Sequence, residues 1–244
     1  MYILSLKNPQ NFNILKKLVI AIDGPAASGK STTSKLVAER LGYLNVDTGA
    51  MYRAITLKVL RSNIEPSDSD AIDKLVEDTS VRLEQMNDQI KVFLDNQDVT
   101  KDIRSPEVTA AVSAVSAIPK VRELMVRMQR EIGKNGGVVL EGRDIGTVVF
   151  PDADLKIFMI ANVDERAHRR QKDLERIGVQ VNLEKLIEDI NERDYKDSHR
   201  NLSPLKKAKD AIVLDTTNLT IDEQVDFIVN KAKEMMKKYD SQSR

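Results

Sequence analysis

The chain has 244 residues, with 38 Lys and Arg against 38 Asp and Glu, and it contains no cysteine. This length suits one large domain, or one domain that carries an insert. The balanced charge gives no support to nucleic-acid binding, so any basic site has to be local. The absence of cysteine excludes disulfides and metal sites with thiolate ligands.

The first 16 residues, MYILSLKNPQNFNILK, form a predicted N-terminal tail. The tail lacks the apolar core and the small-residue cleavage site of a signal peptide. No apolar stretch in the chain reaches the roughly 20 residues that a membrane helix needs. We therefore expect a cytoplasmic protein that binds no membrane, with its folded domain starting at residue 17.

Five short apolar runs predict strands that are buried on both faces. They lie at 18–23, 43–46, 138–141, 155–160 and 211–215. Segments with helical periodicity separate them, a pattern typical of a parallel sheet with crossover helices. Gly42 is expected to end the first helix, Pro119 to open a later one and Asn182 to cap another. The sequence therefore predicts an α/β fold.

One stretch, VRLEQMNDQIKVFLDNQDV at 81–99, has strand periodicity instead. Ile90, Val92 and Leu94 share one face, and the pairs Asn87-Asp88 and Asp95-Asn96 are turn signals. We expect a small antiparallel sheet here, inserted with its flanking helices between the second and third parallel strands.

The segment after the first strand, GPAASGKST, fits the phosphate-binding pattern G-x-x-x-x-G-K-[ST] between a strand and a helix. Glycines at both ends let backbone amides point at phosphates, and the helix N-terminus adds positive potential. Lys30 is expected to reach the β- and γ-phosphates of ATP, and Ser31 to hold Mg²⁺. The residues of this predicted nucleotide-binding loop are Gly24, Pro25, Ala26, Ala27, Ser28, Gly29, Lys30, Ser31 and Thr32.

Such a loop occurs in switches, motors and kinases. A guanine-nucleotide switch needs N-K-x-D, but the Asn230-Lys231 pair continues as Ala-Lys. A hydrolytic ATPase stays an alternative, because the strand at 138–141 ends in the acid Glu141. The following EGRDIGTVVFPDAD favours phosphoryl transfer to a small acceptor, since ligands bind at the carboxyl ends of parallel strands.

Two arginines follow predicted strands. Arg143, with Asp144, comes after the third strand, and Arg53 lies in DTGAMYR after the second strand. We interpret DTGAMYR as an unusual turn that places Thr48 and Arg53 near the same sheet edge. A pair of guanidinium groups there suits a phosphate monoester.

Two later segments predict charged helix faces. Arg166, Arg169 and Arg170 in DERAHRRQ have i, i+3, i+4 spacing, which suits a lid over phosphates or, alternatively, a solvated basic face. In ERDYKDSHR, Arg193, Asp197 and Arg200 also share one helix face. The alternative to a binding role for this face is an exposed row of ion pairs.

Together these motifs resemble the bacterial cytidylate kinases, which phosphorylate CMP and dCMP with ATP. The segments that carry the resemblance are IDGPAASGKST, DTGAMYRA, EGRDIGTVVFPDA, ERAHRR and ERD-x-x-D-x-x-R. It implies the nucleoside-monophosphate-kinase fold with a five-stranded parallel core, a lid and an acceptor-binding insert. Its implied divisions are a core at 17–62 and 119–244, an insert at about 63–118 and a lid at about 164–182. The first 16 residues have no counterpart, and SGKST stands where some relatives have GKGT.

The resemblance also implies site residues. Those for the acceptor are Thr48, Tyr52, Arg53, Ser113, Arg122, Arg143, Asp144, Arg193, Asp197 and Arg200. The arginines at 53 and 143 would grip the CMP phosphate near Thr48 and Tyr52. Residues 113, 122 and 144 would read cytosine, and residues 193 and 197 would hold the ribose with Arg200 nearby. The implied catalytic residues are Lys30, Arg143, Arg166 and Arg170.

The expected reaction is in-line transfer of a phosphoryl group from ATP, with Mg²⁺, to CMP or dCMP, giving CDP or dCDP. No strong general base is needed, because the acceptor phosphate is already largely ionised at neutral pH. We expect a monomer with no nucleic-acid partner. The first alternative is a kinase for UMP or AMP. A less favoured alternative is an ATPase or a regulatory nucleotide-binding protein.

Overall fold

Five parallel strands form the central sheet of the protein. The structure is a computed structural model that describes residues 16–65, 67–86, 89–176 and 178–242. The strands are β1 (Val19–Asp23), β2 (Leu44–Asp47), β6 (Val138–Gly142), β7 (Leu155–Ile160) and β8 (Ile212–Asp215). They lie in the order β2-β6-β1-β7-β8, and every neighbouring pair is parallel. All five predicted strands are confirmed, with ends that differ by at most one residue.

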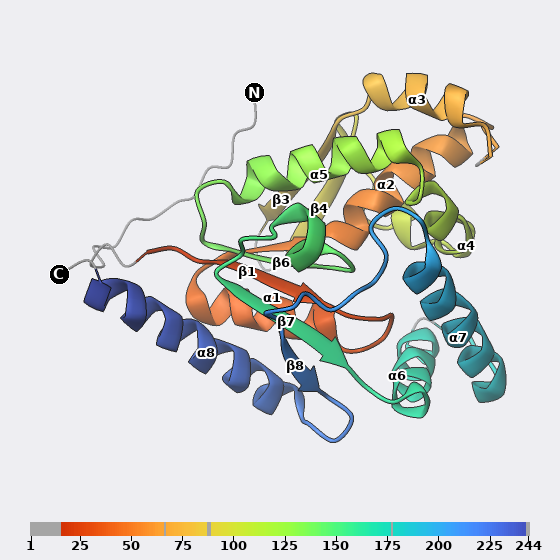
Figure 1. Cartoon of the computed structure of the whole chain (residues 1–244). Coiled ribbons are helices and arrows are strands. Elements are labelled where there is room, and N and C mark those ends of the chain that lie inside the picture. The colour runs from red at the N-terminus through yellow and green to blue at the C-terminus, as the bar shows by residue number, and fades with distance from the viewer. Residues whose placement is uncertain (1–15, 66, 87–88, 177, 243–244) are drawn as a thin grey trace.

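Helices cover both faces of this sheet (Figure 1). Helices α1 (Lys30–Leu41) and α8 (Ile221–Gln242) pack on one face. Helices α2 (Thr48–Arg61), α4 (Pro106–Val115) and α5 (Pro119–Gly133) lie on the other. The sheet is therefore the middle layer of three.

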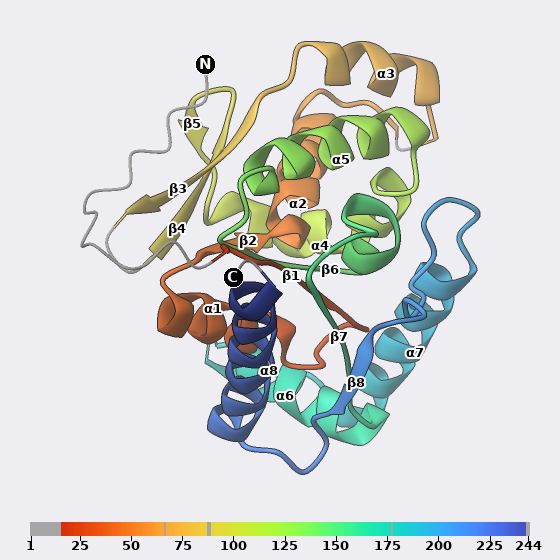
Figure 2. The ribbon, with the colours of Figure 1, turned by 60° about the vertical axis from the view of Figure 1, so that its left-hand side comes forward.

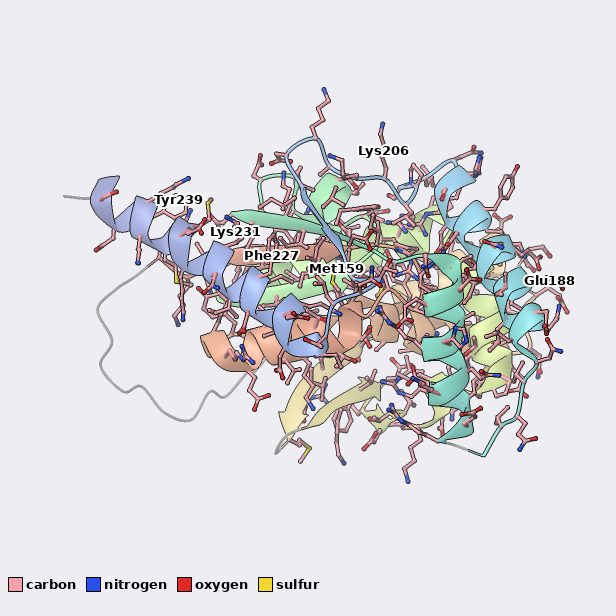
Figure 3. All side chains as sticks on the ribbon, turned by 90° about the horizontal axis from the view of Figure 1, so that it is seen from below. Met159, Glu188, Lys206, Phe227, Lys231 and Tyr239 are labelled. Carbon is pink, nitrogen blue, oxygen red and sulfur yellow. The ribbon has the colours of Figure 1, made fainter. Side chains whose placement is uncertain are left out.

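The alternation of β1 side chains fixes these layers. Ile20 and Ile22 are fully buried in the apolar cluster beneath α1 and α8, whereas Ala21 belongs to the cluster beneath α2 and α5. Met159 of β7 lies in the first of these clusters with Phe227 of α8 packed against it, and both are labelled in Figure 3. Because both faces bury apolar side chains, the sheet holds its strand ends at fixed positions.

A second, antiparallel sheet lies to one side of the central sheet (Figure 2). Its strands are β3 (Val81–Met86), β4 (Gln89–Leu94) and β5 (Gln97–Asp98), and α3 (Ser69–Glu77) precedes them. Val92 and Leu94 are buried, and Asp95 and Asn96 turn with φ of 46° and 70°. The predicted small sheet and this turn are confirmed, whereas the predicted turn at 87–88 lies outside the described residues.

The predicted helix boundaries are confirmed at three places. Gly42 ends α1 in the left-handed conformation, Pro119 is the first residue of α5, and Asn182 Oδ1 accepts from Lys185 N at 3.2 Å. The prediction of an unusual turn in DTGAMYR is wrong. Asp47 accepts a hydrogen bond from Ala50 N at 2.9 Å and thereby caps α2, which begins directly at Thr48.

Two helices lie beyond the carboxyl ends of the strands (Figure 1). They are α6 (Val163–Glu175) and α7 (Leu183–His199), and they share a small apolar cluster of their own. Two single turns, η1 (Asp102–Arg104) and the π-turn η2 (Ile145–Val149), complete the described elements. In the described part of the chain, no helix combines the length and apolarity needed to cross a bilayer.

The end of the predicted tail contacts the domain. Lys16 Nζ pairs with Asp154 Oδ1 at 2.5 Å and lies 3.7 Å from the centre of the Tyr239 ring. The packed chain therefore includes at least one residue that the sequence analysis assigns to the tail. The rest of that predicted tail, 1–15, lies outside the described residues.

Candidate active site

The loop between β1 and α1 forms the centre of the site. Its first residue, Gly24, has φ of 156°, and a Cβ there would lie 2.1 Å from Met159 O, so only glycine fits beside β7. Gly29 has φ of 94° and precedes α1. Lys30 Nζ donates to Pro25 O at 2.6 Å, which places its charge within the curve of the loop.

The charge of Lys30 is only partly compensated. The pKa of Lys30 is lowered to about 7, first by burial and then by the nearby Arg143 guanidinium, while Glu141 opposes the shift. Burial likewise raises the pKa of Glu141 to about 7, with a contribution from Asp47. The anionic oxygens of a phosphate in this loop favour the protonated lysine, so the loop is matched to a polyanion.

Ser31 and Glu141 form the part of the site that suits Mg²⁺. Ser31 Oγ donates to Glu141 Oε2 at 2.8 Å, and the other oxygen, Oε1, is buried without a hydrogen-bond partner. No group of three or more His, Cys, Asp or Glu side chains gathers as a metal site among the described residues. These oxygens fit an ion that takes one or two protein ligands and otherwise binds phosphate oxygens and water.

A cavity of about 400 Å³ opens on the outer side of the loop. It lies between the loop, α6 and the start of α8, and Leu219 and Ile221 give it apolar surface. Gln224 also lines it and is held in place, because its Oε1 accepts from Thr33 Oγ1 at 2.8 Å and its Nε2 donates to Leu219 O at 3.0 Å. Position, size and mixed lining suit the base and sugar of a nucleotide whose phosphates lie in the loop.

Arg169 lines this cavity; its helical spacing makes it a candidate lid residue with Arg166 and Arg170, but the family resemblance implies no site role for it. Its Nη1 donates to Ser28 O at 3.3 Å and to Thr216 Oγ1 at 3.0 Å, and its Nε donates to Glu165 Oε1 at 2.8 Å. The cluster in DERAHRRQ is the signal that pointed to this face. Helical spacing alone does not distinguish Arg169 from Arg170, because both follow Arg166 by about one turn.

Arg166 is buried against the inner side of the loop. Its side chain is 8% exposed, its Nη1 donates to Ala26 O at 3.3 Å, and it pairs with Asp194 of α7. The alternative of a solvated basic face is therefore wrong for this residue. Arg170 is half-buried, and its charge lowers the pKa of both Arg53 and Arg193, after larger contributions from burial and other arginines.

Several guanidinium groups converge on the other side of the loop. Arg53 Nη1 donates to Thr109 Oγ1 at 2.9 Å. The pKa of Arg53 is lowered to about 10, chiefly by burial and then by the positive charge of Arg193. Burial and then Arg143 lower the pKa of Arg193. Because these cations destabilise one another, they form a site that favours a bound anion.

Asp197 of α7 joins part of this cluster. Its Oδ2 accepts from Arg143 Nε at 2.9 Å and lies 3.9 Å from Arg193 Nε, and its Oδ1 accepts from Ser113 Oγ at 3.4 Å. Asp197 is 4% exposed, so the alternative of an exposed ion-pair stripe on α7 is wrong. The structure brings Ser113 to Asp197 rather than to the other two residues of the predicted base site.

Arg122 and Asp144 form a buried ion pair behind this cluster. Arg200 Nη2 lies 3.9 Å from Asp144 Oδ1. The Tyr52 ring lies 5.6 Å from Arg122 Cζ, so Tyr52 stands at this end of the site. Thr48 Oγ1 donates to Glu141 O at 2.6 Å and ties the start of α2 to β6.

Comparisons with known proteins give a consistent result. The sequence model of the family described as cytidylate kinase matches residues 20–234. A cytidylate kinase of Ligilactobacillus salivarius (strain UCC118) is 51% identical over 221 residues, 91% of this chain and 99% of the relative. One of Bacillus pumilus (strain SAFR-032) is 52% identical over 222 residues, again 91% and 99%. A solved gluconokinase from Sinorhizobium meliloti 1021 covers 94% of this chain and 99% of its own at 14% identity and a TM-score of 0.46, a remote likeness on which nothing rests.

Proposed function

The chain belongs to the cytidylate kinase family, and from that premise we propose that it transfers the γ-phosphoryl group of ATP to CMP and dCMP, giving CDP and dCDP. One observation supports the detailed reaction best. Arg143 and Arg193 lie close enough to Lys30 to lower its pKa, after the larger effect of burial. The anion site of the loop and that of the acceptor arginines are therefore neighbours, as direct transfer between two phosphates requires.

In the proposed mechanism, the loop and Lys30 hold the ATP phosphates while Arg53 and Arg143 hold the CMP phosphate. An oxygen of that phosphate attacks the γ-phosphorus in line, and the bond to the β,γ-bridging oxygen breaks. Arg166 and Arg170 reach the transferring group and spread its charge. The protein acts by positioning and by charge, and α6 and α7 exclude the water that would otherwise accept the phosphoryl group.

The base and ribose are held by the residues behind the acceptor arginines. Asp144 accepts from the amino group of cytosine, and Arg122 donates to N3 or O2 of the ring. Ser113, near Asp197, completes the site, while Arg193 and Asp197 hold the ribose with Arg200 nearby. Uracil presents the opposite pattern at positions 3 and 4, so the same groups disfavour UMP.

The proposed function also implies a metal ion, an oligomeric state and a cellular location. Ser31 would hold Mg²⁺ with Glu141 behind it, and the ion would neutralise phosphate charge. We propose that the chain acts as a monomer, with the core at 17–62 and 119–244, the insert at about 63–118 and the lid at about 164–182. ATP and nucleoside monophosphates as substrates support a cytoplasmic setting.

An acceptor screen with ATP tests the proposed function. We expect ADP to form rapidly with CMP and dCMP and slowly with UMP and AMP. Rapid ADP formation with UMP or AMP but not with CMP would instead indicate one of the alternative kinases. Phosphate release from ATP at a rate independent of any acceptor would indicate an ATPase.

A further inference from the structure

Ser203, in the loop that follows α7, has contacts that its sequence position did not suggest. Its hydroxyl Oγ accepts a hydrogen bond from Arg122 Nε at 3.0 Å. Its carbonyl oxygen accepts one from Arg200 Nε at 2.6 Å. Arg122 and Arg200 are the two arginines that flank Asp144, so one serine holds both cations beside that carboxylate.

The Ser203 hydroxyl also acts on Asp144. Burial raises the pKa of Asp144, and Arg122, Arg200 and a hydrogen bond from Ser203 oppose that rise. A hydroxyl can accept one hydrogen bond and donate another at the same time. The 3.0 Å contact with Arg122 Nε places this hydroxyl beside the buried ion pair of Arg122 and Asp144.

The backbone of Ser203 is strained in order to reach this position. Its φ is 49°, in the left-handed region that non-glycine residues rarely occupy, and the next residue is Pro204, which favours an extended conformation before it. Leu205 N donates to Asp197 O at 2.7 Å and returns the loop to α7. Strain of this kind persists where the surrounding contacts fix it, and it clusters at functional sites.

The orientation of Arg122 shows what the serine contributes. The guanidinium has a different partner at each nitrogen: Ser203 Oγ at Nε, Ser116 O at Nη1 at 3.2 Å, and Asp144 at Nη2. When Asp144 accepts from a cytosine amino group, the bond to Nη2 weakens. Without Ser203, a single contact to Ser116 O would then hold the guanidinium, and the group could rotate about it.

We propose that Ser203 is a positioning residue of the base site, which keeps Arg122 and Arg200 aligned around Asp144 while cytosine is bound. The inference rests on the proposed function, because it assigns Arg122 and Asp144 to the base. It predicts that loss of the Ser203 hydroxyl weakens recognition of CMP and leaves recognition of ATP unchanged.

The test compares Ser203→Ala and Ser203→Gly with wild type and with Ser198→Ala, which removes an exposed hydroxyl on α7 whose Oγ donates to Asp194 O. The alanine variant leaves the strain at this φ unchanged, whereas glycine relieves it, so the two differ in loop strain but share the missing hydroxyl. For each protein, kcat and KM are measured for CMP, UMP and ATP, together with the thermal midpoint.

We expect both Ser203 variants to raise the KM for CMP about tenfold, because a hydrogen bond to a charged group is lost. The ratio of kcat/KM for CMP to kcat/KM for UMP should fall about tenfold as well. The KM for ATP and the Ser198→Ala values should match wild type. An unchanged ratio in both variants, or an equal loss for CMP, UMP and ATP, would overturn the inference. If wild type itself does not prefer CMP, the proposed function fails instead, and the two failures are distinguishable.

Discussion

Arg143 Nε donates a hydrogen bond to Asp197 Oδ2 at 2.9 Å, which joins the residue after β6 to the last turn of α7. The side chain of Arg143 is 21% exposed, whereas the side chain of Asp197 is 5% exposed. The aspartate thus fixes the direction of the arginine while leaving part of the guanidinium free for a ligand. The end of β6 and helix α7 therefore position this guanidinium together.

The first prediction concerns the acceptor phosphate. Arg53→Ala and Arg143→Ala should each raise the KM for CMP by about 10- to 100-fold, because each removes a charge-assisted contact to the phosphate. The KM for ATP should change little. Arg61→Ala, on the exposed surface of the same helix as Arg53, is the matched control and should behave as wild type. A rise in the KM for ATP alone would show that the two arginines are wrongly placed.

A second prediction concerns the loop lysine. Lys30→Ala should lower kcat by roughly 10³-fold, since the charge acts mainly where negative charge spreads over the transferring phosphoryl group. Folding should survive, because burial of the lysine already disfavours its charged form. Lys35→Ala, at an exposed position of α1, serves as the control. Near-normal turnover of the Lys30 variant would disprove the phosphate-loop assignment.

Arg169 gives a prediction for the donor side. Arg169→Ala should raise the KM for ATP about tenfold and leave the KM for CMP near wild type, because Arg169 lines the outer cavity and contacts Ser28 of the loop and Thr216. The neighbouring His168→Ala, exposed on α6, should have no effect on either constant. Steady-state kinetics with each substrate varied in turn separates the two ends of the site, and a loss confined to CMP would contradict this placement.

Asp23 predicts a pH dependence of stability. Burial raises the pKa of Asp23 from 3.8 to about 6, although its oxygens accept from Ile145 N and Gly146 N at 2.8 Å. The folded carboxyl binds a proton more tightly than the unfolded one, so its contribution is fully present below the unfolded pKa. That contribution, at most about 3 kcal/mol, is lost as pH rises through the folded pKa.

The difference in unfolding free energy between wild type and Asp23→Asn measures this effect, because asparagine does not titrate. The variant should be less stable at low pH, since its amide can accept from one backbone N–H but presents a donor to the other. Its disadvantage should shrink as pH rises from about 4 to about 6. Urea denaturation across this range provides the values, and a disadvantage that grows with pH would contradict the account.

Much of the fold follows from hydrophobic periodicity. The five strands are predicted because both faces of the sheet bury apolar side chains, so each strand is a continuous apolar run between amphipathic helices. The loop at 24–32 is predicted because its glycines and lysine occur in one local pattern. Local patterns of this kind do not depend on distant parts of the chain.

The parts that sequence reasoning missed depend on distant contacts. Burial of Asp197 follows from Arg143 and Ser113, which are far from it in sequence. Ser203 reaches Arg122 across 81 positions, and no local pattern marks it. The start of α2 differs, because it depends on a local signal: Asp47 caps the helix, and the interpretation of DTGAMYR as a turn did not take this cap into account.

The most direct test of the central claim is the ratio of kcat/KM for CMP to that for UMP, in wild type and in Asp144→Ala and Arg122→Met. Arg127→Met, on the exposed face of the same helix as Arg122, is the control. A site built to pair a polar edge disfavours the wrong base by up to ~10⁴-fold. We predict strong preference for CMP in wild type and control, with a narrower ratio in both site variants caused mainly by loss of activity on CMP. An unchanged ratio in both variants would contradict the account.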